Sequence, residues 1–201
     1  MRRIIKIGGS MLLREHLTTA VNQWLAAQSA GQTLIIIGGG KLIDAVRELD
    51  QQHAMPPQQT HWTCVDLLSV TANFAADLFG WPLLKTEQQW DAVVQQNRTL
   101  SSPGVTSLPT VITPAVFYNE RTSASEAGSP ISGLPNDWRT TTDSIAALLA
   151  HRVDADELVL LKSCPIPPEM SHTKLAQAGI VDDAFPTIAR DLRSVRIEQL
   201  R

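Results

Sequence analysis

Two glycine-rich segments, one of them just after a lysine, are the parts of this sequence whose residue types and spacing suggest chemistry. Lys6 is followed by Gly8-Gly9-Ser10, and a second apolar segment ends in Gly38-Gly39-Gly40. Glycine lets backbone N–H groups approach an anion closely, and a lysine beside such a turn suits a phosphate whose charge must be neutralised while it moves. A single glycine turn is as typical of a strand-to-helix connection that binds nothing. Two such turns, after the first two apolar segments, favour a phosphate site.

A carboxylate is added by residues 134–150, LPNDWRTTTDSIAALLA. Thr141 and Thr142 place hydroxyl groups at the predicted start of a helix, and Asp143 lies in its first turn, where negative charge is favourable. Alone, this pattern describes an ordinary capped helix. If Asp143 lay close to Lys6, its charge would keep that ammonium protonated and oriented.

Other phosphate and metal motifs do not fit this sequence. GxxxxGK[ST] is absent, which excludes a P-loop, and the second glycine segment stands where a dinucleotide-binding fold would place an acidic residue. His53, His61 and Cys64 straddle a linker and a helix start, so we predict no metal site. The HRD-type motif that supplies a base in protein kinases is also absent, which favours an acid over an alcohol as phosphoryl acceptor.

The elements that would position these residues alternate between strands and helices. Short, β-branched apolar segments predict strands over 2–7, 33–37, 157–161 and 109–117, the last ending near Pro114. Helical spacing of apolar residues predicts helices over 11–30, 41–53, 61–79 and 142–150. This alternation predicts an α/β protein, an αβα three-layer sandwich with a mainly parallel sheet. Ligands bind beyond the carboxyl ends of strands in such sheets, where both glycine segments fall.

Three connecting or surface features carry further predictions. Residues 54–60, AMPPQQT, are interpreted as a linker, with Thr60 as the N-cap of the helix that Gly80 would end. Residues 119–137 are rich in Ser, Gly, Pro and Asn and predict a long, functional loop. An apolar stripe on the helix 61–79 indicates either packing within the protein or a dimer face; its members are Leu67, Val70, Phe74 and Leu78.

Length and composition indicate one soluble globular domain. The chain has 201 residues, 43% of them hydrophobic, and a formal net charge of −3 without a run of lysines or arginines. We therefore expect a small-molecule substrate as partner, and neither nucleic acid nor a membrane. The most apolar stretch, residues 34–37, is too short to cross a bilayer. Cys64 and Cys164 form neither a CxxC motif nor a disulfide framework, which suits the reducing cytoplasm.

The order of these motifs carries a resemblance to a known family. KIGGS after the first predicted strand, GGG after the second, then TTDSIAALLA and ELVLLK resemble the amino acid kinase family, which includes acetylglutamate, aspartate, carbamate and uridylate kinases. The resemblance spans residues 2 to about 163. The short length, HW at 61–62, LPNDWRTTTDSIA and GIVDDAFP are most similar to the branch that phosphorylates aminomethylfuran-methyl phosphate in methanofuran-type cofactor biosynthesis.

The resemblance implies a single kinase domain that uses ATP and Mg²⁺ and forms a homodimer. Residues 1–130 would form the acceptor-binding lobe and residues 131–201 a shortened nucleotide-binding lobe. The implied catalytic residues are Lys6, Asp143 and Lys162. The implied ATP- and phosphate-binding residues are Gly8, Gly9, Ser10 and Lys174. The implied acceptor-binding residues are Gly38, Gly39, Gly40, His61, Trp138 and Thr142.

The sequence departs from the family after the strand that ends in LVLLKS. Relatives usually carry an aspartate there and a second phosphate-binding lysine in a later loop, whereas this chain has Lys162-Ser163-Cys164. Lys162, Lys174 or a neighbouring subunit would then take the second cationic role. The favoured function is a kinase with a phosphate acceptor. The alternatives are a kinase with a carboxylate acceptor and a nucleotide-binding regulatory protein that has lost turnover.

Overall fold

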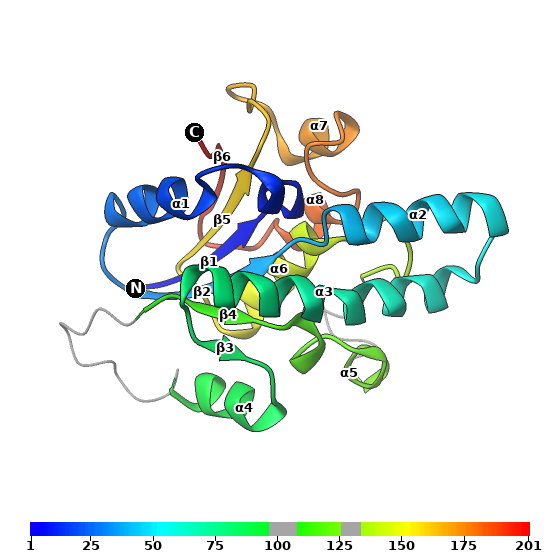
Figure 1. Ribbon diagram of the computed structural model, residues 1–201, viewed down its shortest axis with the longest axis horizontal. Helices are drawn as coiled ribbons and strands as arrows, with labels where there is room; N and C mark the ends of the chain where they lie inside the picture. The colour runs from blue at the N-terminus through cyan, green and yellow to red at the C-terminus, as the bar shows by residue number, and fades with distance from the viewer. Residues whose placement is uncertain (97–107, 126–133) are drawn as a thin grey trace.

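The computed structural model describes residues 1–96, 108–125 and 134–201, which contain a parallel sheet covered by helices on both faces (Figure 1). The strands of the described residues are β1 (Arg2–Ile7), β2 (Gln32–Ile37), β3 (Leu83–Leu84), β4 (Thr110–Ile112), β5 (Glu157–Lys162) and β6 (Val195–Gln199). All pairings between them are parallel, in the order β3-β4-β2-β1-β5-β6. The predicted αβα sandwich with a parallel sheet is therefore confirmed, with β1 near the centre.

The helices follow the strands in the alternation that the sequence predicted. The α-helices are α1 (Leu17–Ala26), α2 (Lys41–His53), α3 (Pro57–Phe79), α4 (Glu87–Gln96), α5 (Glu120–Ser125), α6 (Thr142–Arg152), α7 (His172–Gln177) and α8 (Phe185–Ile188). Short 3₁₀ helices are η1 (Gly9–Leu13) and η2 (Pro114–Val116). In Figure 1, α2 and α3 run side by side and extend beyond the sheet.

The two faces of the sheet bury two separate apolar clusters. Because side chains alternate along a strand, Ile4 of β1 packs on the face covered by α6, whereas Ile5 packs on the face covered by α1. The same alternation holds in β5, where Leu158 and Leu160 face α6 and Val159 faces α1. The position of a polar residue along β1 or β5 therefore determines whether its side chain faces α6 or α1.

The start of α3 differs from the prediction. The helix begins at Pro57 rather than after Thr60, and the Thr60 hydroxyl donates to the Pro56 carbonyl at 3.2 Å instead of capping the helix. Proline is tolerated in a first turn because its missing N–H would have no helical partner there. The predicted end is confirmed, since Gly80 follows α3 with φ +66°.

Several short elements were not predicted from the sequence. They include β3 and α4, and the closing elements α7, α8 and β6, which are too short or too polar to give a clear period. Part of the loop predicted over 119–137 forms α5, and residues 126–133 lie outside the described residues. Within the described ranges, no helix is both long enough and apolar enough to span a membrane.

The apolar stripe of α3 does not pack into the core of this chain. Val70 is 51% exposed, Phe74 56% and Leu78 43%. Packing within the protein, the first of the two interpretations, therefore fails for these three side chains. The dimer face remains a prediction.

Candidate active site

Two lysines from neighbouring strands meet one carboxylate at the carboxyl edge of the sheet. Lys6 Nζ lies 2.9 Å from Asp143 Oδ1, and Lys162 Nζ donates a hydrogen bond of 2.7 Å to Asp143 Oδ2. All three side chains are buried, each less than 9% exposed. We call these residues the lysine cluster. They are the three residues predicted to be catalytic, and the fold brings them into direct contact.

Strand alternation explains why both lysines reach the same helix. Lys6 occupies the same face of β1 as Ile4, and Lys162 the same face of β5 as Leu160, so both point toward α6. Asp143 is in the first turn of α6, whose residues 142–150 are all buried. The α6 helix therefore presents its carboxylate between the two strand ends.

The two contacts to Asp143 are not equivalent. Lys162 donates a well-aligned hydrogen bond to Oδ2, whereas the Lys6 ammonium makes a close but less directed contact with Oδ1. An ammonium held by charge rather than by a directed bond can turn its N–H donors toward another anion. Lys6 is thus the better placed of the two to contact a phosphate.

Charge interactions keep the cluster ionised despite burial. Burial acts to raise the pKa of Asp143, but the charges of Lys6 and Lys162 outweigh it and hold this pKa below its usual value. Burial lowers the pKa of Lys162, and the charge of Lys6 lowers it further, against the opposing effects of Asp143 and Asp182. A carboxylate held in its charged form by two ammonium groups is a poor proton acceptor.

A second, partly buried carboxylate, Asp182, supports the start of α6 from the segment between α7 and α8. Its Oδ2 accepts hydrogen bonds from the Thr141 backbone N–H at 2.9 Å, the Thr141 hydroxyl at 2.8 Å and the Ser144 backbone N–H at 3.0 Å. Its Oδ1 accepts from the Ser144 hydroxyl and from Phe185 N–H. The helix that carries Asp143 is therefore capped from a distant part of the chain and not, as predicted, by its own threonines.

The two glycine turns pack directly against each other. A Cβ atom on Gly9 would lie 2.1 Å from the backbone nitrogen of Gly40 and 2.5 Å from the carbonyl oxygen of Gly38. Such distances are impossible for a real side chain, so glycine at this position is required by contact with the second turn. By contrast, a Cβ on Gly8 would meet nothing closer than 3.5 Å. Gly9 is explained by packing, and Gly8 is the member of the first turn with space beside it.

Ser10 extends the first turn toward β5. Its hydroxyl lies 3.2 Å from the Ser163 hydroxyl, directly after Lys162. The predicted phosphate-binding turn therefore touches the segment that follows the second lysine. This places the residues after β1 and β5 next to each other beyond the lysine cluster.

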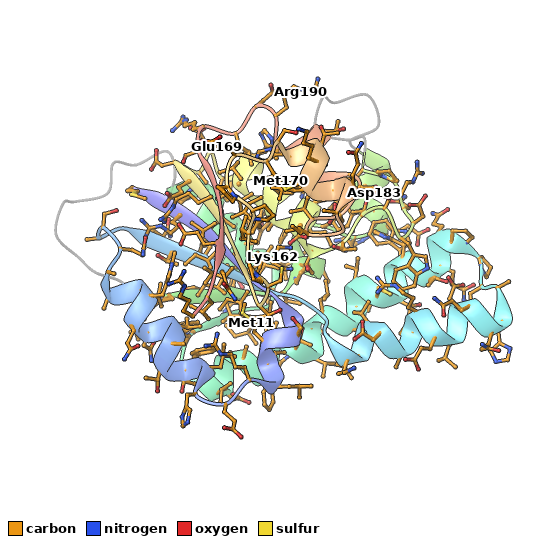
Figure 2. The ribbon with its side chains drawn as sticks, turned by 90° about the horizontal axis from the view of Figure 1, so that it is seen from above. Met11, Lys162, Glu169, Met170, Asp183 and Arg190 are labelled. Atoms are coloured by element: carbon orange, nitrogen blue, oxygen red, sulfur yellow. The ribbon has the colours of Figure 1, made fainter. Side chains whose placement is uncertain are left out.

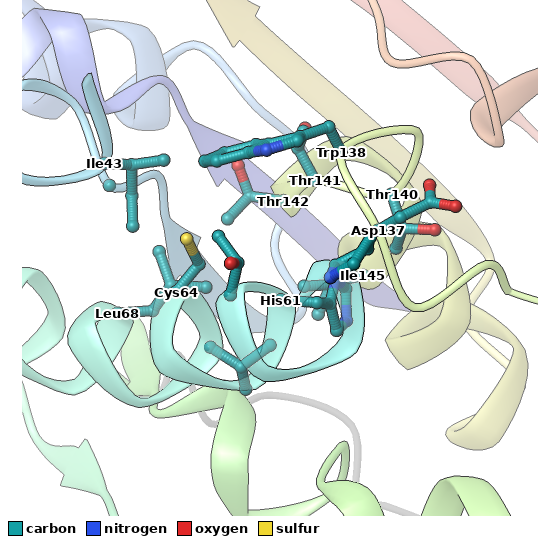
Figure 3. Close-up of a pocket in the computed structure, with 14 residues that line it drawn as sticks. Ile43, His61, Cys64, Leu68, Asp137, Trp138, Thr140, Thr141, Thr142 and Ile145 are labelled. Atoms are coloured by element: carbon teal, nitrogen blue, oxygen red, sulfur yellow. The ribbon is translucent and has the colours of Figure 1, made fainter. Parts of the chain in front are cut away.

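A pocket with an empty volume of about 480 Å³ lies beside this edge of the sheet (Figure 3). Its walls come from the start of α2, the first half of α3, residues 137–142 and α6. Gly39, His61, Trp138 and Thr142, four of the six predicted acceptor-binding residues, line it together. The other two, Gly38 and Gly40, pack against the first glycine turn. Figure 3 shows the Trp138 ring lying across the pocket, opposite α3.

Specific contacts hold the two aromatic sides of the pocket. Trp138 Nε1 donates to Asp50 Oδ2 at 2.6 Å, and the Arg47 guanidinium lies 4.6 Å from the centre of a Trp138 ring, so α2 fixes this ring. His61 Nε2 lies 2.9 Å from the Tyr118 hydroxyl. Burial lowers the pKa of His61, against a hydrogen bond to the backbone of Asp137, so the imidazole stays neutral at neutral pH.

The wall of the pocket is mainly apolar. Its carboxylate, Asp137, is already paired with Arg139, whose Nη2 donates at 2.6 Å. The Thr140 hydroxyl is buried and has no hydrogen-bond partner. Burial raises the pKa of Cys64 to about 11, so this thiol is neutral and unreactive at neutral pH. The pocket offers apolar surface and isolated polar groups rather than a second charged cluster.

Comparisons with known sequences and solved structures point to the same kind of protein as the site does. The model of the amino acid kinase family matches residues 1–165. The chain belongs to the amino acid kinase family. No curated protein matches the sequence closely enough to count as a relative.

Solved structures share the fold of this family member at low sequence identity. UMP kinase from Bacillus anthracis has a TM-score of 0.61 and 12% identity, with 99% of this chain and 87% of that chain covered. Uridylate kinase from Archaeoglobus fulgidus has a TM-score of 0.59 and 14% identity over 98% and 91% of the two chains. Aspartate kinase from Synechocystis has a TM-score of 0.58 and 15% identity, but only 38% of that chain is covered. These similarities show the fold.

In this member of the amino acid kinase family, Lys162 rather than Lys174 lies beside Lys6 and Asp143. Among the described residues, Lys6 and Lys162 are the lysines paired with Asp143. Lys174 is exposed on α7 and has no ion pair to Asp143. Its predicted role in phosphate binding remains a prediction.

A second hollow, with an empty volume of about 630 Å³, lies between residues 166–170, α7 and β6. Its apolar lining includes Ile166, Met170 and Ile197. Figure 2 shows Lys162 near the centre of the view, with Glu169 and Met170 to one side of it. The sequence analysis did not identify this hollow, because most of its lining comes from the unpredicted closing elements and the loop before them.

Sequence reasoning also missed Asp182 and Tyr118. Asp182 lies in GIVDDAFP, which carried part of the resemblance but suggested no role for this residue. Tyr118 is in contact with His61, 57 positions away. Neither contact leaves a periodic or motif signal in a single sequence.

Proposed function

We propose that this chain is an ATP-dependent kinase that transfers a phosphoryl group to a small anionic metabolite. The observation that carries the proposal is the convergence of Lys6, Asp143 and Lys162 beside two packed glycine turns. Phosphoryl transfer depends mainly on positioning and on neutralising charge, which fixed ammonium groups and backbone N–H groups provide. Membership in a family of kinases supports the reaction type.

In this proposal, each cluster residue has a distinct role. Lys6 contacts the phosphoryl group during transfer, because its ion pair with Asp143 leaves its N–H donors undirected. Lys162 takes the place of the second phosphate-binding lysine that the family carries in a later loop. Asp143 keeps both ammonium groups charged and separates them, as a shared counter-ion.

The absence of a suitable base around the described site supports an acceptor that is already an anion. Asp143 is paired with both lysines, and its lowered pKa makes it a poor proton acceptor. His61 lines the pocket, but its ring contacts Tyr118 and is buried. An alcohol acceptor would have to lose a proton, whereas a phosphate or carboxylate would not.

The favoured acceptor is the phosphate group of aminomethylfuran-methyl phosphate, in methanofuran-type cofactor biosynthesis, which would yield a diphosphate and ADP. The lining of the pocket supports a small flat acceptor, since it combines the Trp138 ring with apolar residues such as Ile43 and Ile145. Asp137 is the acidic lining residue that could receive the aminomethyl group. The runner-up acceptor is the carboxylate of an amino acid.

The nucleotide would lie on the other side of the lysine cluster. We assign its base to the hollow beside Met170 and Ile197. Residues 131–201 would then form the nucleotide-binding lobe and residues 1–130 the acceptor-binding lobe, except that Trp138 and Thr142 of the later segment line the acceptor pocket. Members of this family use ATP, usually with Mg²⁺. Among the described residues, no group of three or more His, Cys, Asp or Glu side chains could hold a metal ion. The residues present do not form a cage for Mg²⁺, and we assign it no protein ligands.

Measuring ADP release with Mg-ATP and separate acceptors tests this function. The panel contains aminomethylfuran-methyl phosphate, UMP, aspartate and acetylglutamate. We expect release with the furan phosphate above all others. Release only with a carboxylate would establish the runner-up, and tight ATP binding without release for any acceptor would identify a regulatory protein.

Two variants connect the activity to the site. Lys6→Ala should reduce turnover by about 10²- to 10³-fold, the usual loss for one preorganised charge-stabilising group, with folding intact. Lys85→Ala, at an exposed position after β3, is the matched control and should leave turnover unchanged. Trp138→Ala should raise the acceptor KM while leaving the KM for ATP unchanged. Wild-type turnover in Lys6→Ala would refute the assignment.

A further inference from the structure

Asp182 is a partly buried ionisable group beside the lysine cluster that the proposed reaction does not use. It comes from the segment between α7 and α8, about 40 residues after the start of the helix that it caps. Its two oxygens accept five hydrogen bonds, four of them from Thr141 and Ser144. These two residues flank Asp143 and its neighbour Thr142, so one side chain holds the turn that carries the shared counter-ion.

We propose that Asp182 is a positioning residue of the phosphoryl-transfer site. It holds the first turn of α6 so that Asp143 points between the two lysines, and its negative charge completes a neutral group of two ammonium and two carboxylate groups. The catalytic part of this inference rests on the proposed function. The part that concerns the charge of Lys162 does not depend on the proposed function.

Helix capping alone would not require this residue. An N-cap serine or threonine can satisfy the first N–H groups of a helix without a charge, and α6 already begins at Thr141 and Thr142. Here the Thr141 hydroxyl instead donates to Asp182. A partly buried carboxylate thus takes the place of a neutral cap next to an existing carboxylate, which is unfavourable unless nearby positive charge compensates for it.

The compensating charge comes from β1 and β5. The groups whose charges act on Lys162 are Lys6 on β1, Asp143 on α6 and Asp182; burial and Lys6 lower the pKa of Lys162, and the two carboxylates raise it. Burial and Asp143 raise the pKa of Asp182, against its hydrogen bonds. Tyr118, after η2, also senses Asp182 but is a neutral phenol. Without Asp182, Lys162 would keep its ion pair with Asp143 but would lose the second carboxylate whose charge raises its pKa.

The decisive experiment follows the ionisation of Lys162 itself. The chain has only five lysines, so their side-chain amines can be labelled with ¹⁵N and resolved by NMR, with Lys162→Met used to assign the signal. In Asp182→Asn, which removes the charge and keeps one acceptor oxygen, the titration of Lys162 should move to lower pH. Asp182→Glu, which keeps the charge, should restore it toward the wild-type position.

Ser144→Ala is the matched control for a purely structural role. It removes one hydrogen bond to Asp182 but leaves its charge in place. We expect this variant to lower the unfolding temperature without moving the titration of Lys162. If Asp182→Asn and Ser144→Ala both lower the unfolding temperature and neither moves the titration, Asp182 is only a helix cap and the inference is wrong.

The wild-type protein offers a test that needs no folded variant at position 182. Because the pKa of Asp182 is raised and that of Asp143 is lowered, Asp182 should take up its proton first as the pH falls. The Lys162 amine signal should show a separate inflection at that pH. Its absence would overturn the inference.

Turnover separates this inference from the proposed function. Asp182→Asn should reduce turnover by up to about 10²-fold, the loss expected when a reacting group is displaced by about 1 Å. The alkaline limb of its pH profile should shift in the same direction as the Lys162 titration. If the wild-type protein transfers phosphate to no acceptor, the proposed function fails, while the NMR titrations still decide the role of Asp182.

Discussion

Two clusters of charged side chains lie at opposite ends of the same two strands, and each has two cations around one carboxylate. At the amino ends of β1 and β5, Arg3 Nε donates to Glu157 Oε2 at 2.7 Å, and Arg196 Nε of β6 lies 2.7 Å from Oε1. We call these three residues the arginine cluster. The lysine cluster lies at the carboxyl ends. Strand alternation places the arginine cluster on the face of α1 and the lysine cluster on the face of α6.

The cations of the two clusters are held differently. Arg3 also donates to the carbonyl and the hydroxyl of Ser29, and Arg196 donates to Gln28 and Glu198, so each guanidinium is fixed by several partners. Lys6 is held by one close, less directed ion pair with Asp143. A guanidinium is a planar group of five donors in fixed directions, whereas an ammonium is a compact charge on a flexible stem. The arginine cluster therefore holds several elements together, whereas in the proposed function Lys6 of the lysine cluster turns toward a phosphate.

Removing one cation from each cluster should give the largest contrast. Lys162→Ala should lower turnover by about 10²- to 10³-fold, since a charge-stabilising group is lost while Asp143 keeps Lys6 as partner. Arg196→Ala should leave turnover per folded molecule unchanged and reduce stability. ADP release and thermal unfolding measure the two effects. Equal losses of turnover in both variants would remove the functional distinction between the clusters.

Neutralising the shared carboxylate should have a smaller effect on turnover. Asp143→Asn should reduce turnover by about 10- to 100-fold, because the geometry survives while the counter-ion of both lysines is lost. Glu157→Gln should reduce the free energy of unfolding by about 1 to 3 kcal/mol, as expected for lost hydrogen bonds to a charged group, with turnover kept. Urea unfolding and ADP release report these changes, and a faster Asp143→Asn enzyme would contradict the assigned role.

Exchanging the type of cation tests whether mobility matters. Lys6→Arg keeps the charge but introduces a fork that can bind Asp143 through two donors, so turnover should fall by about tenfold or more while stability is kept. Arg3→Lys should keep turnover and lose about 1 kcal/mol of stability through lost hydrogen bonds. Full activity in the Lys6→Arg variant would show that a mobile ammonium is not needed.

The acid sensitivity of the two clusters should be similar and modest. Burial raises the pKa of Glu157, but Arg3 and Arg196 outweigh it, and the pKa of Asp143 is lowered in the same way. A carboxyl group whose pKa is lowered by folding stabilises the protein above its unfolded pKa, and this contribution is lost as the pH falls through the folded value. Stability should therefore decline from about pH 5 downward. Urea midpoints across this range should decline less steeply in Asp143→Asn and in Glu157→Gln, and unchanged slopes would contradict the assigned ion pairs.

Local sequence patterns were enough to predict the central strands of the sheet and the face that each strand residue occupies. β-branched apolar runs gave the strands and their ends, and strand alternation assigns Lys6 and Lys162 to one face. The sequence identified Gly9 as part of a phosphate-binding turn, and the structure adds a second reason for glycine there, close packing against Gly38 and Gly40. A resemblance to a known family supplied Asp143 as the partner of Lys6.

Only the tertiary structure decided which cation joins Asp143 and what supports that carboxylate. Lys162 and Lys174 were equal candidates in sequence, and the end of β5, next to β1, put one of them beside α6 while the other stayed exposed on α7. Asp182 and Tyr118 reach the site from distant segments through hydrogen bonds that leave no periodic pattern in the sequence. The period of a strand or helix records which face a residue occupies, because a single element fixes that face. A contact between elements depends on how several of them pack, and no short stretch of sequence encodes this packing.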